Sequence, residues 1–190
     1  MNWLRPCAAL AAAALLGACA LLVPAERPAG PGAFDLIGRV AVSYGGRAFA
    51  SSVRWQHTRE RDEIWLLSPV GQTLAHIVGD ATGARLTGAD RKQYRAASVE
   101  SLTRQALGWE LPLARLAWWV RGEIAPGGAA QGVERDERAR LTALIQDGWR
   151  VALAHYPLEE HGGLPRRLEL AGAASEIRLV IDAWRLDAAR

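Results

Sequence analysis

Histidine and cysteine are the residues of this chain best suited to metal binding or nucleophilic catalysis, but their spacing favours neither of these two kinds of chemistry. Structural zinc sites are built mainly from cysteine and histidine at short, regular spacings. Both cysteines, Cys7 and Cys19, lie near the start of the chain, away from every histidine. No two histidines have the spacing that places paired ligands on one helix face; they are His57, His76, His155 and His161. We therefore predict no metal site.

Other enzyme signatures are also missing from the sequence. There is no nucleophile elbow, and the only lysine, Lys92, does not follow a phosphate-cradling glycine pattern. The acidic pairs Asp62-Glu63 and Glu159-Glu160 flank predicted turns, where solvated carboxylates are expected. Only carboxylates brought together by folding would leave room for acid catalysis. We predict no catalytic residue, no cofactor and no enzymatic activity.

The first 18 residues have the pattern of a secretory signal. Arg5 is their only charged residue, and an unbroken run of Ala and Leu follows from Ala8 to Leu16. This run is much shorter than the roughly 20 residues needed to cross a bilayer. We therefore predict that residues 1–18 are a cleaved signal peptide and not a retained transmembrane helix.

A cysteine stands directly after the small residues that end the signal. The tetrapeptide Leu16-Gly17-Ala18-Cys19 resembles the lipobox of bacterial lipoproteins, which implies cleavage before Cys19 and lipid attachment to its sulfur. An ordinary signal with an incidental cysteine is the alternative. Residue 20 is Ala, whereas Asp at this position commonly marks retention in the inner membrane. We expect a lipid-anchored protein of the outer membrane that faces the periplasm.

Composition divides the mature chain into a linker and one domain. Residues 19–33 are rich in Pro, Gly and Ala without periodicity, which predicts a lipidated flexible linker. Residues 34–190 are long enough for one domain with its own core. The net charge is +3, and it becomes +2 when Arg5 is removed with the signal. Basic residues are dispersed along the chain, so we predict no binding to nucleic acid.

Alternating apolar and polar residues predict strands over most of the domain. The clearest pair runs from Phe34 to Tyr44 and from Arg47 to His57, joined by Gly45-Gly46. Asp147-Gly148 predicts another tight hairpin, and residues 125–132 are predicted to form a loop. The remaining predicted strands are 63–68, 72–78, 84–87, 92–96, 134–145, 149–153, 168–170 and 176–184.

Two short helices interrupt the strands. Ser98 is a suitable N-cap for the first, which should end at Gly108, and the second should begin after Pro112 and end before Gly122. Neither is long enough to be stable alone, so both should pack on an apolar surface. We predict a mainly β domain of about 10–11 antiparallel strands, strongly curved into a sheet or barrel, with helices over its mouth.

Tryptophan is unusually frequent. The chain has 8 Trp, of which only Trp3 belongs to the signal, against 2 Phe and 3 Tyr. Large rings can fill the core of a β domain. They can equally line a wide apolar ligand cavity. The pattern alone does not separate these two roles.

Several short segments, in order along the domain, together resemble the LolB family of outer-membrane lipoprotein receptors. Each is weakly specific by itself, but the ordered set after a lipobox is more specific. The segments are residues 34–42, Trp55-Gln56, 68–71, 108–112, 119–122, 148–151, Leu164-Pro165, and 177–179 with Trp184.

The resemblance implies both a fold and a function. The fold is an incomplete, half-open antiparallel β-barrel of the LolA/LolB type, with a short helical lid over its concave apolar face. The implied function is to accept acylated lipoproteins from the periplasmic carrier LolA and insert them into the inner leaflet of the outer membrane. Acyl chains would bind non-covalently in an apolar cavity, and we expect a monomer. A lipocalin-like carrier of a small hydrophobic ligand and a structural outer-membrane lipoprotein are the alternatives.

The resemblance also assigns roles to particular residues. Val70 occupies the apolar position between Pro and Gly that helps the family deliver cargo into the membrane. The family commonly has Leu there, so Val70 buries less area, and an ordinary turn residue is the alternative. The expected cavity or lid residues are Val40, Val42, Val53, Trp55, Leu66, Leu116, Trp119 and Trp149.

Overall fold

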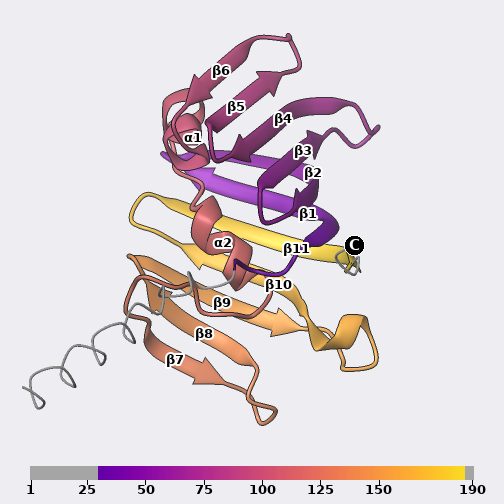
Figure 1. Ribbon diagram of the computed structural model, residues 1–190, viewed down its shortest axis with the longest axis vertical. Helices are drawn as coiled ribbons and strands as arrows, with labels where there is room; N and C mark the ends of the chain where they lie inside the picture. The colour runs from indigo at the N-terminus through magenta and orange to yellow at the C-terminus, as the bar shows by residue number, and fades with distance from the viewer. Residues whose placement is uncertain (1–29, 187–190) are drawn as a thin grey trace, which may run out of the picture.

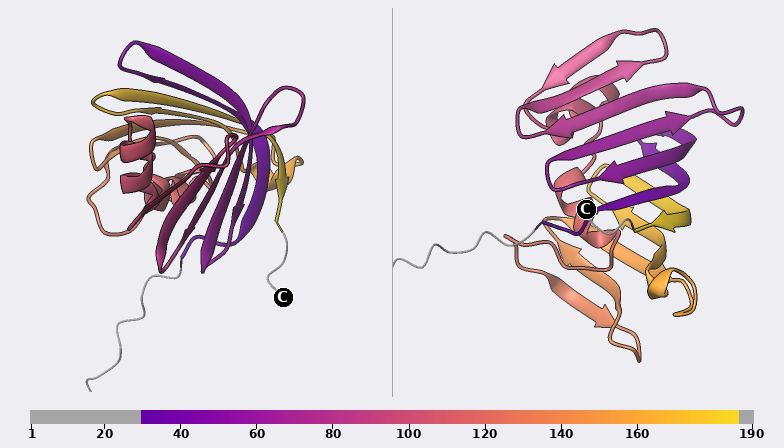
Figure 2. Two further views of the ribbon diagram at one scale, coloured as in Figure 1. Left: turned by 90° about the horizontal axis from the view of Figure 1, so that it is seen from above. Right: turned by 45° about the vertical axis from the view of Figure 1, so that its right-hand side comes forward.

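The computed structural model describes residues 30–186 and places eleven antiparallel strands in one strongly curved sheet (Figures 1 and 2). The spatial order of the strands is β6-β5-β4-β3-β2-β1-β11-β10-β9-β8-β7, so the first and last strands pair at its centre. The edge strands β6 and β7 do not pair with each other, which leaves the barrel half open. The strands are β1 (Phe34–Tyr44), β2 (Arg47–His57), β3 (Arg61–Leu67), β4 (Thr73–Asp80), β5 (Gly83–Gly88), β6 (Gln93–Ala96), β7 (Gln131–Arg135), β8 (Leu141–Gln146), β9 (Trp149–His155), β10 (Pro165–Ala171) and β11 (Ser175–Arg185).

The two glycine-containing hairpin predictions are confirmed. β1 and β2 pair over their whole length, from Phe34 opposite His57 to Tyr44 opposite Arg47. Gly45 and Gly46 have φ angles of 51° and 73°, and Asp147 and Gly148 have φ angles of 50° and 80°. Both hairpins therefore have the two consecutive positive φ angles that match the twist of the flanking strands.

The two predicted helices are also confirmed, and both lie on the concave side of the sheet (Figure 2). Helix α1 (Val99–Leu107) begins at Ser98, whose side chain accepts a hydrogen bond from the Ser101 backbone, and ends at Gly108 with φ 80°. Helix α2 (Leu113–Trp119) follows Pro112. A 3-10 turn, η1 (His161–Gly163), lies between β9 and β10. Among residues 30–186, no helix is long and apolar enough to cross a membrane.

One predicted strand is wrong: residues 134–145 form a hairpin of two strands, and its first strand begins inside the predicted loop 125–132. The turn contains no Gly, Pro or Asn to indicate it. Instead, the carboxylate of Asp136 accepts hydrogen bonds from the backbone N–H groups of Arg138 and Arg140 and from the Arg140 guanidinium. These bonds, the Arg140 guanidinium above all, lower the pKa of Asp136 to about 2.

The described domain has one continuous hydrophobic core. It contains inward-facing residues from the strands together with Val99 and Leu102 of α1 and Leu116 and Trp119 of α2. Every helix and strand of residues 30–186 lies between Phe34 and Arg185. Cys19, the predicted signal 1–18 and most of the predicted linker 19–33 lie outside the described residues.

Gly38 lies at an irregularity in the central strand pair, and replacing it should lower the free energy of unfolding. The register of β1 against β11 shifts between Ile37 and Gly38, and a Cβ atom on Gly38 would lie 2.2 Å from the Val180 carbonyl oxygen. We expect Gly38→Ala to lower the free energy of unfolding by about 1–3 kcal/mol, because a backbone oxygen cannot move aside freely. Urea unfolding followed by Trp fluorescence measures this. Gly30→Ala is the control, since nothing lies within 4 Å of its Cβ position, and an equal loss in both variants would contradict the prediction.

Candidate functional site

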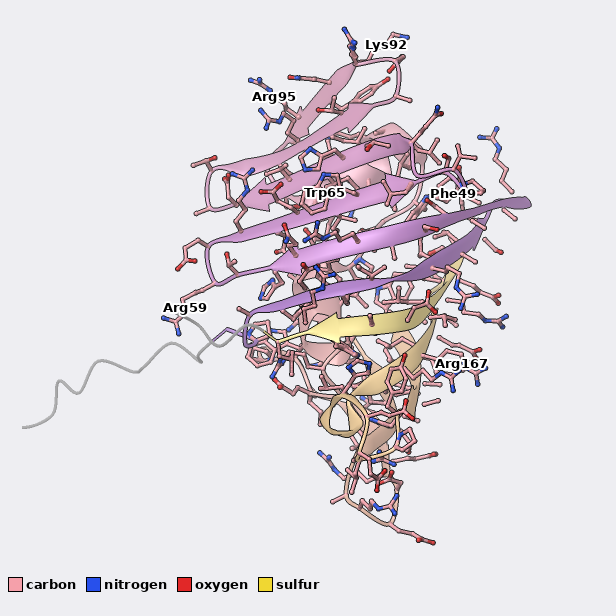
Figure 3. The ribbon with its side chains drawn as sticks, turned by 90° about the vertical axis from the view of Figure 1, so that its right-hand side faces the viewer. Phe49, Arg59, Trp65, Lys92, Arg95 and Arg167 are labelled. Atoms are coloured by element: carbon pink, nitrogen blue, oxygen red, sulfur yellow. The ribbon has the colours of Figure 1, made fainter. Side chains whose placement is uncertain are left out.

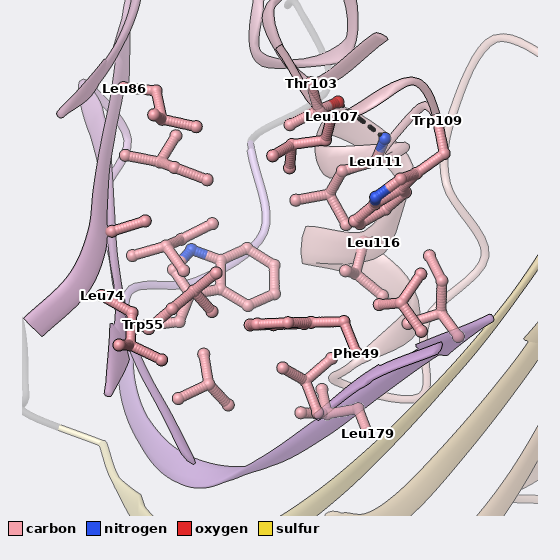
Figure 4. Close-up of a pocket in the computed structure, with 18 of the residues that line it drawn as sticks. Phe49, Trp55, Leu74, Leu86, Thr103, Leu107, Trp109, Leu111, Leu116 and Leu179 are labelled. Atoms are coloured by element: carbon pink, nitrogen blue, oxygen red, sulfur yellow. Dashed lines mark hydrogen bonds between the residues drawn. The ribbon is translucent and has the colours of Figure 1, made fainter. Parts of the chain in front are cut away.

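An apolar cavity of about 330 Å³ lies between the concave face of β1–β5 and the helical segment (Figure 4). Its size falls at the lower end of the range for small-molecule pockets. In Figure 4, Trp55 and Leu179 from the sheet face Leu111 and Leu116 from the helical segment. The lining residues are Leu36, Val40, Val42, Tyr44, Phe49, Val53, Trp55, Ile64, Leu66, Leu74, Ala75, Ile77, Leu86, Gly88, Thr103, Leu107, Trp109, Leu111, Leu116, Ile177 and Leu179.

The few polar groups in the lining are largely engaged elsewhere. The Thr103 hydroxyl donates to the Glu100 carbonyl at 3.2 Å and accepts the Leu111 N–H at 2.9 Å. The Trp55 indole N–H donates to Asp62 at 2.7 Å. Because the remaining lining is almost entirely hydrocarbon, the cavity is suited to a flexible apolar chain and not to a polar substrate.

The cavity opens at one end of the strands. Phe49 and Leu74, near the β1–β2 and β3–β4 turns, are 38% and 37% exposed. At the opposite end of the same strands, Trp55 is only 3% exposed, and Leu36 and Ile64 are also buried. A ligand chain would therefore enter between Phe49 and Leu74, and we call this end of the cavity the mouth.

The helical segment is held as one unit beside the mouth. Glu100 of α1 accepts the Ala114 N–H of α2 at 3.0 Å, and Thr103 holds the connecting residue Leu111. Trp109 of the same connection lies with its ring 6.2 Å from that of Tyr44 on β1. These contacts place the connection between α1 and α2 across the cavity from the sheet.

Six of the eight expected cavity residues line this cavity: Val40, Val42, Val53, Trp55, Leu66 and Leu116. Most of the helical side of the lining was not predicted from the sequence, including Leu107, Trp109 and Leu111. Phe49 and Leu74 at the mouth were not predicted either. The apolar residues that follow Gly108 were the available signal for Trp109 and Leu111, but no local pattern shows which residues face a hollow.

Trp119 and Trp149, expected in the cavity or its lid, do not line the cavity. Trp119 lies on helix α2 of the lid, as that expectation allows, whereas Trp149 lies on strand β9 and belongs to neither. Trp119 is fully buried on α2, and its indole donates to Gln146 at 3.0 Å; Gln146 in turn donates to the carbonyls of Ala125 and Gly128. This network directs Trp119 towards β8, where it fills the space in front of the C-terminal half of the sheet. Trp149 begins β9 and packs against Gly172.

Val70 is the tip of the β3–β4 turn and is 79% exposed. The turn is closed by Ser68, whose N–H donates to the Gln72 carbonyl at 2.8 Å, and by Gly71 with φ 79°. Its neighbour on the same hairpin is Leu74, so Val70 lies at the same end of β3 and β4 as the mouth. Cys19 lies outside the described residues.

Charged groups lie outside the cavity, on the convex face of the sheet and at the strand ends (Figure 3). On the convex face, burial would raise the pKa of Asp35, but hydrogen bonds from Arg54 and Gln56 keep it below its usual value. The Trp65 ring on the same face stacks on His76 with centroids 4.9 Å apart. No group of three or more potential metal ligands occurs in residues 30–186.

Comparisons with known proteins point to one family. The family model described as "Outer membrane lipoprotein LolB" matches residues 32–184. The chain is 44% identical to the outer-membrane lipoprotein LolB of Nitrosomonas europaea, over 80% of this chain and 72% of that protein. It is 38% identical to that of an Azoarcus species, over 94% and 93% of the two chains.

Among solved structures, a LolA superfamily protein from Nitrosomonas europaea superimposes with a TM-score of 0.51. The sequence identity is 9%, and the match covers 84% of this chain and 88% of the other. At this identity the likeness concerns the fold alone. It agrees with the predicted half-open barrel with a helical lid.

Substitutions in the Trp119–Gln146 network should lower the free energy of unfolding but leave ligand binding in the apolar cavity unchanged. We expect Gln146→Leu to cost about 3 kcal/mol, because it leaves one buried indole N–H and two carbonyls without this partner. Trp119→Phe keeps most of the ring and should cost about 1–2 kcal/mol. Urea unfolding measures both, and binding of an apolar probe to the folded variants should stay within about twofold of the parent. A larger loss in Trp119→Phe than in Gln146→Leu would contradict this ranking.

Proposed function

Since the chain belongs to the LolB family of outer-membrane lipoproteins, we propose that it is a receptor that accepts acylated lipoproteins from a LolA-like periplasmic carrier. It then inserts them into the inner leaflet of the outer membrane. The names of its relatives and the family match over residues 32–184 support this function. The observation that carries it is the apolar cavity, whose mouth opens at Phe49 and Leu74.

The binding step is non-covalent burial of an acyl chain. Removing one methylene from water contributes about 0.8 kcal/mol, so a lipoprotein needs an apolar host while it crosses the periplasm. The lining consists almost wholly of aliphatic and aromatic side chains from β1–β5, β11 and the helical segment. No nucleotide-binding motif occurs in the sequence, so transfer runs towards hosts of higher affinity, from carrier to this cavity and then to the bilayer.

Residues 1–18 are the signal peptide, residues 19–33 the linker and residues 34–190 the lipid-binding domain in this proposal. Lipid on Cys19 anchors the protein to the outer membrane. A single acyl chain gives only reversible binding, whereas several on one cysteine would hold the domain there stably. The anchor fixes the location, while the cavity binds the lipid of other proteins. The protein acts as a monomer without a cofactor.

Val70 is proposed as the residue that contacts the membrane during delivery. It is the most exposed large apolar side chain of the described residues, and it lies at the mouth end of the β3–β4 hairpin. An apolar tip beside the mouth would shorten the path of the acyl chain through water. Valine buries less area than leucine would, so this contact is a weak one.

The receptor function predicts transfer in solution. Residues 20–190, which lack the lipid-bearing cysteine, should take a labelled acylated lipoprotein from LolA, as measured by co-elution of the label with this chain. A folded domain that takes none would contradict the receptor function. Retention of a small hydrophobic molecule in a narrow closed pocket would instead favour a lipocalin-like carrier, and binding of neither would favour a structural role.

The role of Val70 predicts a separation of uptake from release. Val70→Glu should leave uptake from LolA unchanged but slow the release of cargo into liposomes by about tenfold, because a carboxylate resists entry into the bilayer. Leu158→Glu is the matched control: Leu158 is 49% exposed and lies beyond β9 at the opposite end of the strands. Release by Val70→Glu at the rate of the control would remove Val70 from the delivery step.

A further inference from the structure

Trp55 forms the wall of the cavity at the end opposite the mouth. It lies two residues before the end of β2, where it pairs with Leu36 of β1 and Ile64 of β3. All three side chains line the cavity and are buried, whereas Phe49, six residues earlier on the same strand, is exposed at the mouth. A chain that entered at Phe49 and ran along β2 would end against the Trp55 indole.

The indole is fixed from behind. Its N–H donates to Asp62 Oδ1 at 2.7 Å, and the same oxygen lies 2.8 Å from His57 Nδ1. The Phe34 ring packs edge-on against Trp55 at 4.9 Å and stacks on His57 at 5.0 Å. Trp55 is therefore held on two sides and does not turn freely.

A second hollow lies on the far side of this wall. Its volume is about 530 Å³, and its lining includes His57, Asp62, Val99 and Glu100, together with charged residues of the adjoining turns. It shares no lining residue with the apolar cavity. The Trp55–Asp62 hydrogen bond joins the wall of one hollow to the wall of the other. Trp55 thus separates a hydrocarbon-lined space from a hollow whose lining includes several charged residues.

We propose that Trp55, positioned by Asp62, is a stop that sets how much of an acyl chain the cavity accepts. This inference rests on the proposed function, since it concerns the same cavity. A dry cavity of about 150 Å³ holds one benzene, or about 25 Å³ per carbon, so 330 Å³ accommodates about a dozen carbons. A longer chain would have its remaining carbons outside the mouth, where Phe49 and Leu74 are exposed.

The test is a chain-length profile. Isothermal titration calorimetry of residues 20–190 with octanoate, decanoate, laurate, palmitate and stearate gives the affinity for each fatty acid. In the parent domain, each added methylene should tighten binding by about fourfold up to about twelve carbons, and further carbons should add little. In Trp55→Leu the gain should continue, so that the palmitate-to-laurate affinity ratio rises by about tenfold or more.

Variants of Asp62 test its positioning role without changing the wall residue. Asp62→Ala removes the acceptor of the indole N–H and should shift the profile in the same direction as Trp55→Leu. Asp62→Asn keeps an oxygen that can accept the indole N–H and should restore the parent profile. If Trp55→Leu does not fold, as judged by near-ultraviolet circular dichroism, the two Asp62 variants decide the question.

Trp65→Leu is the matched control, because Trp65 is on the neighbouring strand but stacks on His76 on the convex face (Figure 3). Its profile should equal that of the parent. An unchanged palmitate-to-laurate ratio in Trp55→Leu and Asp62→Ala, with the parent binding fatty acids normally, would overturn the stop and leave the receptor function intact. Failure of the parent domain to bind any of the fatty acids would instead overturn the proposed function together with this inference.

Discussion

An apolar cavity in water persists only if the elements around it are prevented from collapsing into it, and this constraint governs the rest of the structure. Residues 30–186 contain no cysteine, so disulfides do not brace this part of the chain. Hydrogen bonds between the helices take that role. Thr103 holds Leu111, and Glu100 holds the first turn of α2. These bonds fix the helical segment as a unit, so the hydrocarbon side chains that face the sheet line a hollow instead of closing it.

The two halves of the sheet meet this constraint in different ways, because the space in front of one is filled and the space in front of the other is open. In front of the C-terminal half, α2 supplies Trp119, and Gln146 fixes its indole while satisfying two loop carbonyls. The space in front of that half is filled by the buried side chains of Trp119 and Gln146. In front of the N-terminal half, β1–β5 curve away from the connection between α1 and α2, and the space between them remains open. The packed side chains in front of the C-terminal half make dispersion contacts that the lining of the cavity lacks. The packed half therefore contributes more to the stability of the fold than the half that holds the cavity.

The sequence predicted those parts of this arrangement that depend on local chemistry. Gly45-Gly46, Asp147-Gly148 and Gly108 act through their own backbone geometry, and Ser98 acts through a side-chain bond to a residue three positions on; each was assigned correctly. The β7–β8 turn was missed because its turn residue, Asp136, acts through bonds to Arg138 and Arg140 that composition does not indicate.

The site was harder to predict, since alternation tells which face of a strand is apolar but not whether that face meets a side chain or a hollow. Trp55 on strand β2 and Trp119 on helix α2 both face inward and are buried, yet one lines the cavity and the other fills the core. Their hydrogen-bond partners, Asp62 and Gln146, lie on other elements, so the residues next to either tryptophan do not show which role it has.

The positions of the mouth and of the first strand bear on how the domain would work beside a membrane. β1 begins at Phe34, at the closed end of the cavity, whereas Val70 and the mouth lie at the other end of the strands. If Cys19 carries the anchor, the 15 residue steps to Phe34 span at most about 50 Å. The strand β1 is about 35 Å long. The linker is therefore long enough to run beside the domain while the mouth faces the same membrane, and an acyl chain that leaves the cavity could enter that bilayer directly.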